Sequence, residues 1–275
     1  MTPLRVFIGS GETSLVERKT LIHSLRQHAT SPLDISVFNG TYDTIERAAE
    51  PPRSLSVPLA LRAGSATEFS IYRFLIPELC GFAGRAVYLD SDILALADVA
   101  ELFALPMNGH AVLASTPCDN QRNLGVMLID CGAWRIAVPA LMEDLAHGRY
   151  RLEEVKALGA RFMAHNVPSF SVGELPAQWN ALDVRSADTK LLHYTKVRTQ
   201  PWRRSDHPYG DVWFAAFKEA YARGDITRQD LRRAHDRGGI RSDLRRGNEP
   251  PLLPMFWKAL RRRLNAKLRR ADQPQ

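Results

Sequence analysis

A short apolar run that ends in two aspartates constrains this chain most. Ala86-Val87-Tyr88-Leu89 is followed directly by Asp90-Ser91-Asp92. An uninterrupted apolar run of this length is typical of a parallel strand that is buried on both faces. In open α/β sheets, ligands bind at the carboxyl ends of such strands. The run therefore predicts an α/β fold with an acidic loop at the edge of its sheet.

The two carboxylates have two interpretations when they are taken alone. Aspartates at i and i+2 can both reach one hard cation, such as Mg²⁺ or Mn²⁺, that also takes phosphate oxygens. An exposed Asp90 and an Asp92 that caps a turn would explain the same residues equally well. The rest of the chain has to decide between a metal site and a solvated turn.

The opening of the chain supports the α/β interpretation. A strand is expected at 4–9, a turn at Gly9-Ser10-Gly11, a helix at 15–28 and a second strand at 35–38. This β-α-β order is that of a nucleotide-binding unit. The remaining expected elements are a loop region at 41–64, a helix at 67–79, a helical turn at 99–103, strands at 111–114 and 125–130, a helix at 134–146 and a late strand at 190–194.

Composition indicates a protein with a substantial core, because 45% of the 275 residues are hydrophobic. The three cysteines, Cys80, Cys118 and Cys131, are an odd set without metal-type spacing. They favour a reducing compartment over a disulfide framework. We find no apolar stretch of signal-peptide or membrane-spanning length. The expected location is the cytoplasm, or the inner face of the cytoplasmic membrane.

Positive charge gathers toward the carboxyl terminus and accounts for the net charge of +7. Beyond a linker at 236–251, residues 256–270 form a helical pattern with one apolar stripe and cations over most of the remaining surface. Such a helix suits an anionic membrane surface. A helix docked on its own domain by the same stripe is the alternative. Nucleic acid is not expected as a partner, because no known binding motif accompanies the charge.

His193 adds a third metal-type side chain, at the end of the late strand. If that strand and the strand before Asp90 belong to one sheet, all three side chains lie just past strand ends. Two carboxylates and an imidazole suit Mn²⁺ better than Ca²⁺. A buried structural histidine is the alternative. The cations Lys196 and Arg198 follow closely, and together with a metal they would neutralise a diphosphate.

Two further positions point to a ligand. Asn123 and Gly125 begin an apolar strand, where glycine permits close backbone approach; an asparagine turn that starts the strand is the alternative. Arg73 lies on an otherwise apolar helix and needs an anionic partner or a route to the surface.

Together, the motifs resemble family 8 glycosyltransferases, which include glycogenin and the bacterial galactosyl- and glucosyltransferases that build lipopolysaccharide. The resemblance covers about residues 4–215. It rests on the following motifs, in this order: the strand and glycine turn at 4–11, Thr-Glu-Phe with an arginine at 67–73, Val-Tyr-Leu-Asp-Ser-Asp-Ile-Leu at 87–94, Asn-Leu-Gly-Val-Met-Leu-Ile at 123–129, Leu-Pro-Ala-Gln-Trp-Asn at 175–180, Leu-Leu-His-Tyr-Thr at 191–195 and Pro-Trp at 201–202.

The resemblance implies a GT-A fold, with a Rossmann-like mixed sheet in a catalytic domain at 1–215 and a basic helical extension at 216–275. It also implies a metal, usually Mn²⁺ and otherwise Mg²⁺, and a UDP-sugar donor. In the family pattern, Asp90, Ser91 and Asp92 form the Asp-x-Asp segment that holds the metal and touches the ribose, and His193 completes the metal site. The other donor contacts are expected from Gly9, Ser10, Gly11, Arg73, Asn123 and Gly125, with Lys196 or Arg198 on the diphosphate.

The resemblance further implies a retaining hexosyltransferase that acts on a glycan or glycolipid acceptor of the lipopolysaccharide or surface-polysaccharide type. The chain departs from the family in one place, because the usual Asp-Gln-Asp segment before the late strands is missing. Glu174 and Gln178 are the nearest candidates to act beside the sugar. A front-face transfer, which needs no protein nucleophile, suits this departure. A double displacement, which would need a carboxylate or amide near C1 such as Glu174 or Gln178, is the alternative.

Three other functions compete with this one. A metal-dependent nucleotidyltransferase or phosphohydrolase would use paired aspartates and a basic cleft, but it would not require the Trp-Asn and Pro-Trp elements. A degenerate family member would bind the sugar nucleotide without transferring it. A nucleic-acid-binding protein would leave Asp90-Ser91-Asp92 without a purpose.

Overall fold

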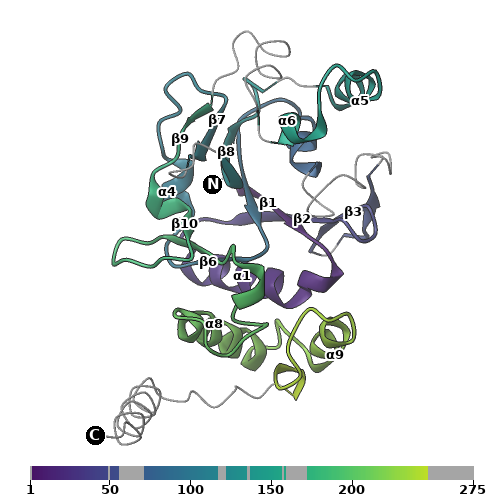
Figure 1. Ribbon diagram of the computed structural model, residues 1–275. Coiled ribbons are helices and arrows are strands. Elements are labelled where there is room, and N and C mark those ends of the chain that lie inside the picture. The colour runs from purple at the N-terminus through teal and green to yellow at the C-terminus, as the bar shows by residue number, and fades with distance from the viewer. Residues whose placement is uncertain are drawn as a thin grey trace, which may run out of the picture.

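The computed structural model describes residues 2–48, 50–55, 71–116, 122–134, 137–156, 158 and 172–246. A mixed sheet of eight strands has the order β4-β3-β2-β1-β5-β8-β7-β9, and a small sheet has the order β10-β11-β6 (Figure 1). The strands of the main sheet are β1 (Leu4–Ser10), β2 (Leu33–Asn39), β3 (Thr44–Arg47), β4 (Arg53–Ser54), β5 (Arg85–Asp90), β7 (Val112–Ser115), β8 (Asn123–Asp130) and β9 (Val172–Glu174).

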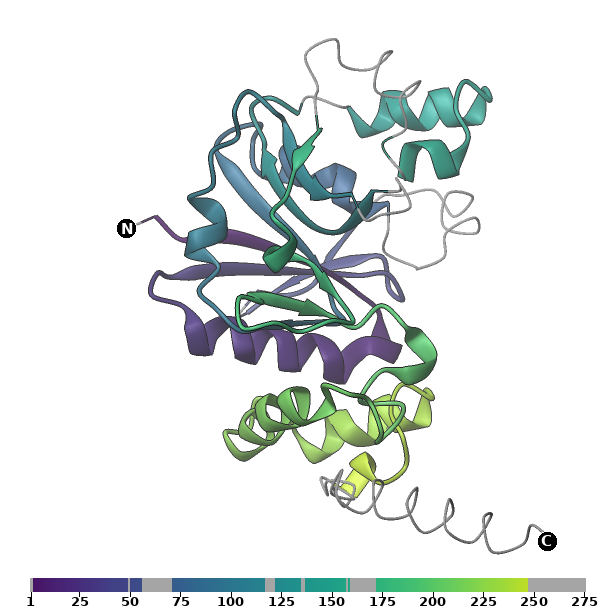
Figure 2. The same cartoon turned by 60° about the vertical axis from the view of Figure 1, so that its left-hand side comes forward.

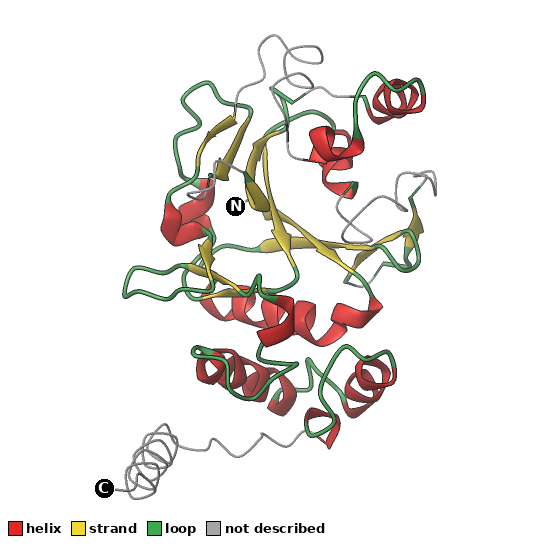
Figure 3. Cartoon of the chain, viewed as in Figure 1, coloured by secondary structure: helices red, strands yellow, loops and turns green. Residues whose placement is uncertain are grey.

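The helices and the small sheet complete the described fold. The strands of the small sheet are β6 (Ile93–Ala95), β10 (Ala181–Leu182) and β11 (Leu191–His193). The helices are α1 (Leu15–His28), α3 (Ile76–Leu79), α4 (Ala100–Phe103), α5 (Val138–Ala146), α6 (Leu152–Lys156), α8 (Gly210–Ala222) and α9 (Arg228–Asp236). Figure 3 shows helices on either side of the yellow strands of the main sheet.

Alternation along β1 explains how the sheet buries both faces. The strand pairs in parallel with β2 and with β5. Val6 and Ile8 pack in one cluster with Leu21 of α1, whereas Phe7 packs in another cluster with Phe74 on the opposite face. Because successive side chains of a strand point to opposite faces, an unbroken apolar run is what a strand covered on both faces requires.

The helices α8 and α9 pack against α1 on the side away from the main sheet (Figures 1 and 2). Leu15 and Val16 of α1 share a core with Trp213, Phe217 and Leu231. The predicted domain boundary at residue 215 falls inside α8. The described part of the proposed extension therefore shares a hydrophobic core with the β-α-β unit.

Three sequence-based expectations are corrected by the structure. The expected loop region at 41–64 contains β3 and β4, two short antiparallel edge strands that bury Ile45. The helix expected from 134 begins only at Val138, because Pro139 lies at the first positions of a helix, where its missing N–H costs nothing. The described part of the helix expected at 67–79 is a 3₁₀ turn, Tyr72–Leu75, followed by the one-turn helix α3.

Other expectations fall on residues outside the described part of the chain. These expectations concern residues 56–64 of the loop region, residues 67–70, Cys118, the end of the linker from 247 onward and the terminal basic helix at 256–270. Within the described residues, Cys80 and Cys131 are free thiols. None of the helices described is long and apolar enough to cross a bilayer.

Candidate active site

Asp90, Asp92 and His193 are brought together where the main sheet meets the small sheet. Asp90 ends β5, the chain bends at Ser91, and β6 begins directly after Asp92. Strand β6 pairs antiparallel with β11, and the pairing sets His193 opposite Ile93. Strands β5 and β11 therefore lie in different sheets, so the one-sheet condition under which the sequence brought the three residues together is not met. The segment from Asp90 to β6 joins them.

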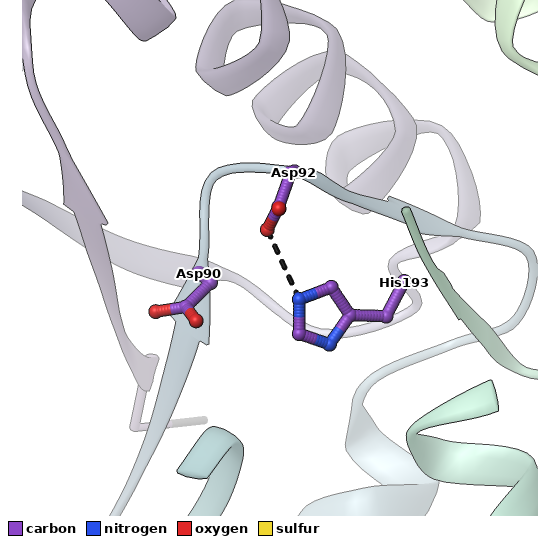
Figure 4. A group of neighbouring side chains, drawn as sticks. All are labelled: Asp90, Asp92 and His193. Atoms are coloured by element: carbon purple, nitrogen blue, oxygen red, sulfur yellow. Dashed lines mark ion pairs between the residues drawn. The ribbon is translucent and has the colours of Figure 1, made fainter. Parts of the chain in front are cut away.

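The cluster has the composition and spacing of a metal site. The Asp92 Oδ1 atom lies 3.1 Å from His193 Nε2 (Figure 4). One ligand atom from each of the three residues lies within 4.8 Å of the other two. The Asp90 Oδ1 atom accepts a hydrogen bond of 2.7 Å from the Tyr88 hydroxyl. A hard or borderline cation such as Mg²⁺ or Mn²⁺ prefers this set of oxygen and nitrogen donors.

Electrostatics indicate that negative charge is concentrated here. Burial raises the pKa of the Asp90 carboxyl, and the neighbouring Asp92 carboxylate adds to the rise while Arg73 opposes it. Burial disfavours the imidazolium of His193, but the Asp92 carboxylate outweighs that effect and raises the pKa of His193. A divalent cation would relieve the repulsion between the two carboxylates.

A hydrogen-bond chain fixes which nitrogen of His193 faces the aspartates. The Asn180 amide nitrogen donates to Ser115 Oγ at 2.6 Å and to Asn123 Oδ1 at 3.1 Å, so the amide oxygen faces His193. His193 Nδ1 lies 2.8 Å from that oxygen and donates to it. The raised pKa favours a proton on Nε2 that Asp92 Oδ1 accepts, and a bound cation would replace this proton and take the Nε2 lone pair, as at a metal-ligating histidine.

Gly125 lets the side chains of the cluster lie close against the backbone of β8. A Cβ atom at this position would lie 2.3 Å from His193 Cε1 and 2.8 Å from Asp90 Oδ2. The Asn123 side chain accepts from the Gly125 N–H at 2.9 Å, which ties the head of β8 to the same hydrogen-bond chain. The donor set, the orientation of His193 and this close approach to the backbone fit a divalent cation.

The residues expected around the donor divide into two groups, and the first adjoins the cluster. Gly9 pairs with Asp90 across β1 and β5, and its carbonyl accepts from the Ser91 N–H at 3.1 Å. Ser10 and Gly11 follow at the carboxyl end of β1, where both are buried. The Arg73 guanidinium lies 4.8 Å from the centre of the Tyr88 ring and donates to the Leu124 carbonyl at 2.9 Å.

The second group lies around the cluster at a greater distance. Glu174 and Gln178 line a pocket of about 510 Å³ that Ser115 and Asn180 also line. Asn180 belongs to both sites, so the pocket adjoins the acidic cluster. Lys196 and Arg198 are exposed at the 3₁₀ turn Val197–Thr199, and the choice between them stays open.

Two residues of the site were missed by the sequence reasoning. Asn180 orients His193, and the Trp-Asn motif at 179–180 was the available signal. Gln200 is 5% exposed, and its amide nitrogen donates to Asp92 Oδ2 at 3.1 Å and to the Tyr194 carbonyl at 2.8 Å. Its place directly before Pro201-Trp202, where the resemblance to family 8 implies a lysine, was the signal.

Comparisons with known proteins support the fold. No protein-family model matches the chain. Protein CDI of Arabidopsis thaliana is 23% identical over 245 residues, which are 79% of this chain and 87% of that protein. The probable glycosyl transferase Gly of Streptococcus gordonii is 26% identical over 152 residues, which are 47% of this chain but only 21% of that protein.

Solved glycosyltransferases share the architecture. The galactosyltransferase LgtC, solved with donor and acceptor sugar analogs, superposes with a TM-score of 0.57 at 13% identity, over 81% of this chain and 100% of that chain. The glycosyltransferase GlyE of Streptococcus pneumoniae gives 0.53 at 18% identity, over 78% of this chain and 60% of that chain. The chain therefore has the GT-A fold of glycosyltransferases such as LgtC and GlyE, as its sequence predicted.

Proposed function

We propose that the protein is a metal-dependent glycosyltransferase that moves a hexose from a UDP-sugar to a glycan or glycolipid acceptor. The observation that carries the proposal is the convergence of Asp90, Asp92 and His193, with Nε2 of His193 turned toward the aspartates. The glycosyltransferase fold gives this cluster its context, because ligands of α/β sheets bind at the carboxyl ends of the strands.

The chain's own residues would divide the work as follows. Asp90, Asp92 and His193 would hold Mn²⁺ or Mg²⁺, and the turn after β1, with Gly9, Ser10 and Gly11, would receive the uridine. A bound cation supplies Lewis-acid stabilisation of the charge that develops on the leaving diphosphate. Lys196 or Arg198 would add a second positive charge when its side chain turns toward the phosphates.

The sugar would lie toward the pocket lined by Glu174, Gln178 and Asn180. Asn123 reaches this pocket through its hydrogen bond with Asn180, whereas Arg73 contacts Tyr88, whose hydroxyl donates to Asp90. Glu174 is exposed, and its Oε1 accepts from the Thr116 N–H at 2.9 Å. A carboxylate so close to solvent is a weak candidate for a buried nucleophile, which favours front-face transfer with retention over double displacement.

The wider context of the reaction is part of the same proposal. A glycolipid acceptor of the lipopolysaccharide or surface-polysaccharide type would require access to a membrane. The basic sequence at 256–270 would attach the enzyme to anionic lipid on the cytoplasmic side.

The experiment is an assay of UDP release and of the sugar that is freed. The chain is incubated with a panel of UDP-hexoses, with Mn²⁺ or with a chelator, and the products are separated by chromatography. We expect slow, metal-dependent hydrolysis of one donor, with the released sugar in the donor's anomeric configuration by NMR.

Two variants decide whether the cluster is responsible. Asp92→Asn should lower the rate on the order of 10²- to 10³-fold, the usual cost of one such electrostatic contact. Asp236→Asn, at a carboxylate exposed on the far end of α9, is the matched control and should keep the rate. Metal-dependent binding without any turnover would indicate the degenerate alternative, and release of UMP would indicate a phosphohydrolase.

A further inference from the structure

A second pocket, of about 380 Å³, is lined by residues of α1 and of the neighbouring strands β2 and β3. Its lining contains none of the three residues of the acidic cluster, so it is separate from the candidate active site. Figure 1 shows α1 beneath these strands. The charged residues of its lining are Arg18, Lys19, Arg26, Arg47, Glu46 and Asp225, and its apolar wall is formed by Ile22, Ile35, Val37 and Ala48.

Both carboxylates of the lining already have partners. Glu46 Oε1 accepts from the Asn39 amide at 2.7 Å, and Asp225 Oδ2 lies 2.8 Å from His23 Nδ1. Two of the four cations are similarly engaged, because Lys19 Nζ lies 2.7 Å from an Asp230 carboxylate oxygen and Arg18 Nη2 lies 3.2 Å from Glu12 Oε1. The hydrogen-bond donors of the three arginines, Arg18, Arg26 and Arg47, are therefore the groups in the pocket that are not fully paired.

Each of these arginines has hydrogen-bond donors to spare. Arg18 is 7% exposed, and its Nη2 lies 3.2 Å from Glu12 Oε1 and 3.6 Å from Glu46 Oε2, but its Nη1 is buried without a hydrogen-bond partner. Arg26 is exposed and makes no ion pair or hydrogen bond within the part of the chain that the structure describes. The Arg47 Nη atoms lie 3.9 Å from surface carboxylates, a distance at which ion pairs contribute little.

An anion would correct this imbalance. A buried donor without an acceptor is costly, and three guanidinium groups present planar forks that match phosphate oxygens. The apolar wall leaves room for a small carbon skeleton next to the charged group. We propose that this pocket is an anion site that binds the phosphate monoester group of a ligand, independently of the candidate active site.

The test uses the full chain in a chelator, so that no divalent metal supports binding at the acidic cluster. Inorganic phosphate and glycerol 3-phosphate are titrated by calorimetry at low ionic strength. Arg26→Gln and Arg47→Gln should each weaken binding about tenfold, the cost of a hydrogen bond between charged groups. Arg232→Gln removes an exposed charge of α9 that is absent from the pocket lining and should leave binding unchanged.

The proposal is overturned if neither probe binds, if the two pocket variants bind as tightly as the unaltered chain, or if Arg232→Gln weakens binding equally. Asp92→Asn separates this site from the proposed active site, because it should leave phosphate binding intact. Loss of phosphate binding in that variant would assign the anion to the acidic cluster and refute the pocket.

A further arm identifies the source of the phosphate group. Vesicles of phosphatidylcholine are compared with and without phosphatidic acid, whose headgroup is a phosphate monoester. Cosedimentation that Arg26→Gln and Arg47→Gln weaken would indicate a lipid headgroup. If the two variants bind these vesicles as well as the unaltered chain does but bind glycerol 3-phosphate more weakly, the ligand is a soluble one.

Discussion

Gly125→Ala should damage the metal site through a single added methyl group. Its Cβ would lie 2.3 Å from His193 Cε1 and 2.8 Å from Asp90 Oδ2, while ordinary contacts begin near 3.4 Å. The imidazole would have to retreat by roughly 1 Å to restore such a contact. His193 Nδ1 lies 2.8 Å from Asn180 Oδ1, so a shift of the imidazole by that amount would disrupt this hydrogen bond as well.

The expected magnitude follows from these contacts. Losing the partner that orients a ligating histidine typically lowers metal affinity about 10- to 100-fold. Overpacking a buried site costs about 1–3 kcal/mol of stability, which is not enough to unfold a domain of ordinary stability. We therefore expect Gly125→Ala to be folded, with weakened Mn²⁺ binding and a lowered Tm.

The assay is a calorimetric titration of Mn²⁺, with a melting curve for each variant. Gly132→Ala is the matched control, because its Cβ would lie 3.4 Å from Asp130 Oδ1 and 3.6 Å from the Phe82 carbonyl, both tolerable distances. It should retain the affinity of the unaltered chain. Equal Mn²⁺ affinity in Gly125→Ala and in the control would refute the placement of the metal beside Gly125.

Three further predictions concern buried polar groups. Asn180→Ala removes the acceptor that orients His193 and should lower Mn²⁺ affinity about 10- to 100-fold by calorimetry; unchanged affinity would contradict this role. Gln200→Met keeps the volume but removes the donor to Asp92, so affinity should fall by about tenfold or less, with little change in Tm. Burial raises the pKa of Glu17 to about 8, above its ordinary 4.5. The folded state therefore retains this proton longer than the unfolded state, and the free energy of unfolding in a chelator should fall by roughly 4 kcal/mol between pH 4.5 and 8. Measured by urea denaturation across this range, the free energy of unfolding of Glu17→Gln should depend less on pH than that of the unaltered chain. An equal pH dependence in the two chains would exclude Glu17 as its cause.

Local patterns were sufficient where a single segment determines the structure. Helical spacing predicted α1 from Leu15 to His28, and the apolar run before Asp90 predicted β5, because buried faces repeat with a fixed period. The helix expected at 134–146 was started too early, because Pro139, which lies in the first turn of α5, was not used to mark its start. The edge strands β3 and β4 were missed because a strand of two to four residues is too short to show a period.

Contacts between distant segments explain the rest of the site. The pairing of His193 with Asp92 depends on the small sheet, which is built from strands that lie far apart in the chain. Asn180 and Gln200 act through their hydrogen bonds to those two residues, and no spacing in the sequence encodes such bonds. Resemblance to a family placed the aspartates and the histidine in one site, but it did not reveal the residues that hold them.

The central claim is that the acidic cluster binds a nucleotide sugar through a divalent metal. Its most direct test is calorimetry of the full chain with several UDP-sugars, with and without Mn²⁺, alongside Asp92→Asn. We predict that at least one UDP-sugar binds only when Mn²⁺ is present and that Asp92→Asn abolishes this binding. Absence of metal-dependent binding to every nucleotide sugar, or binding unaffected by Asp92→Asn, would contradict the account.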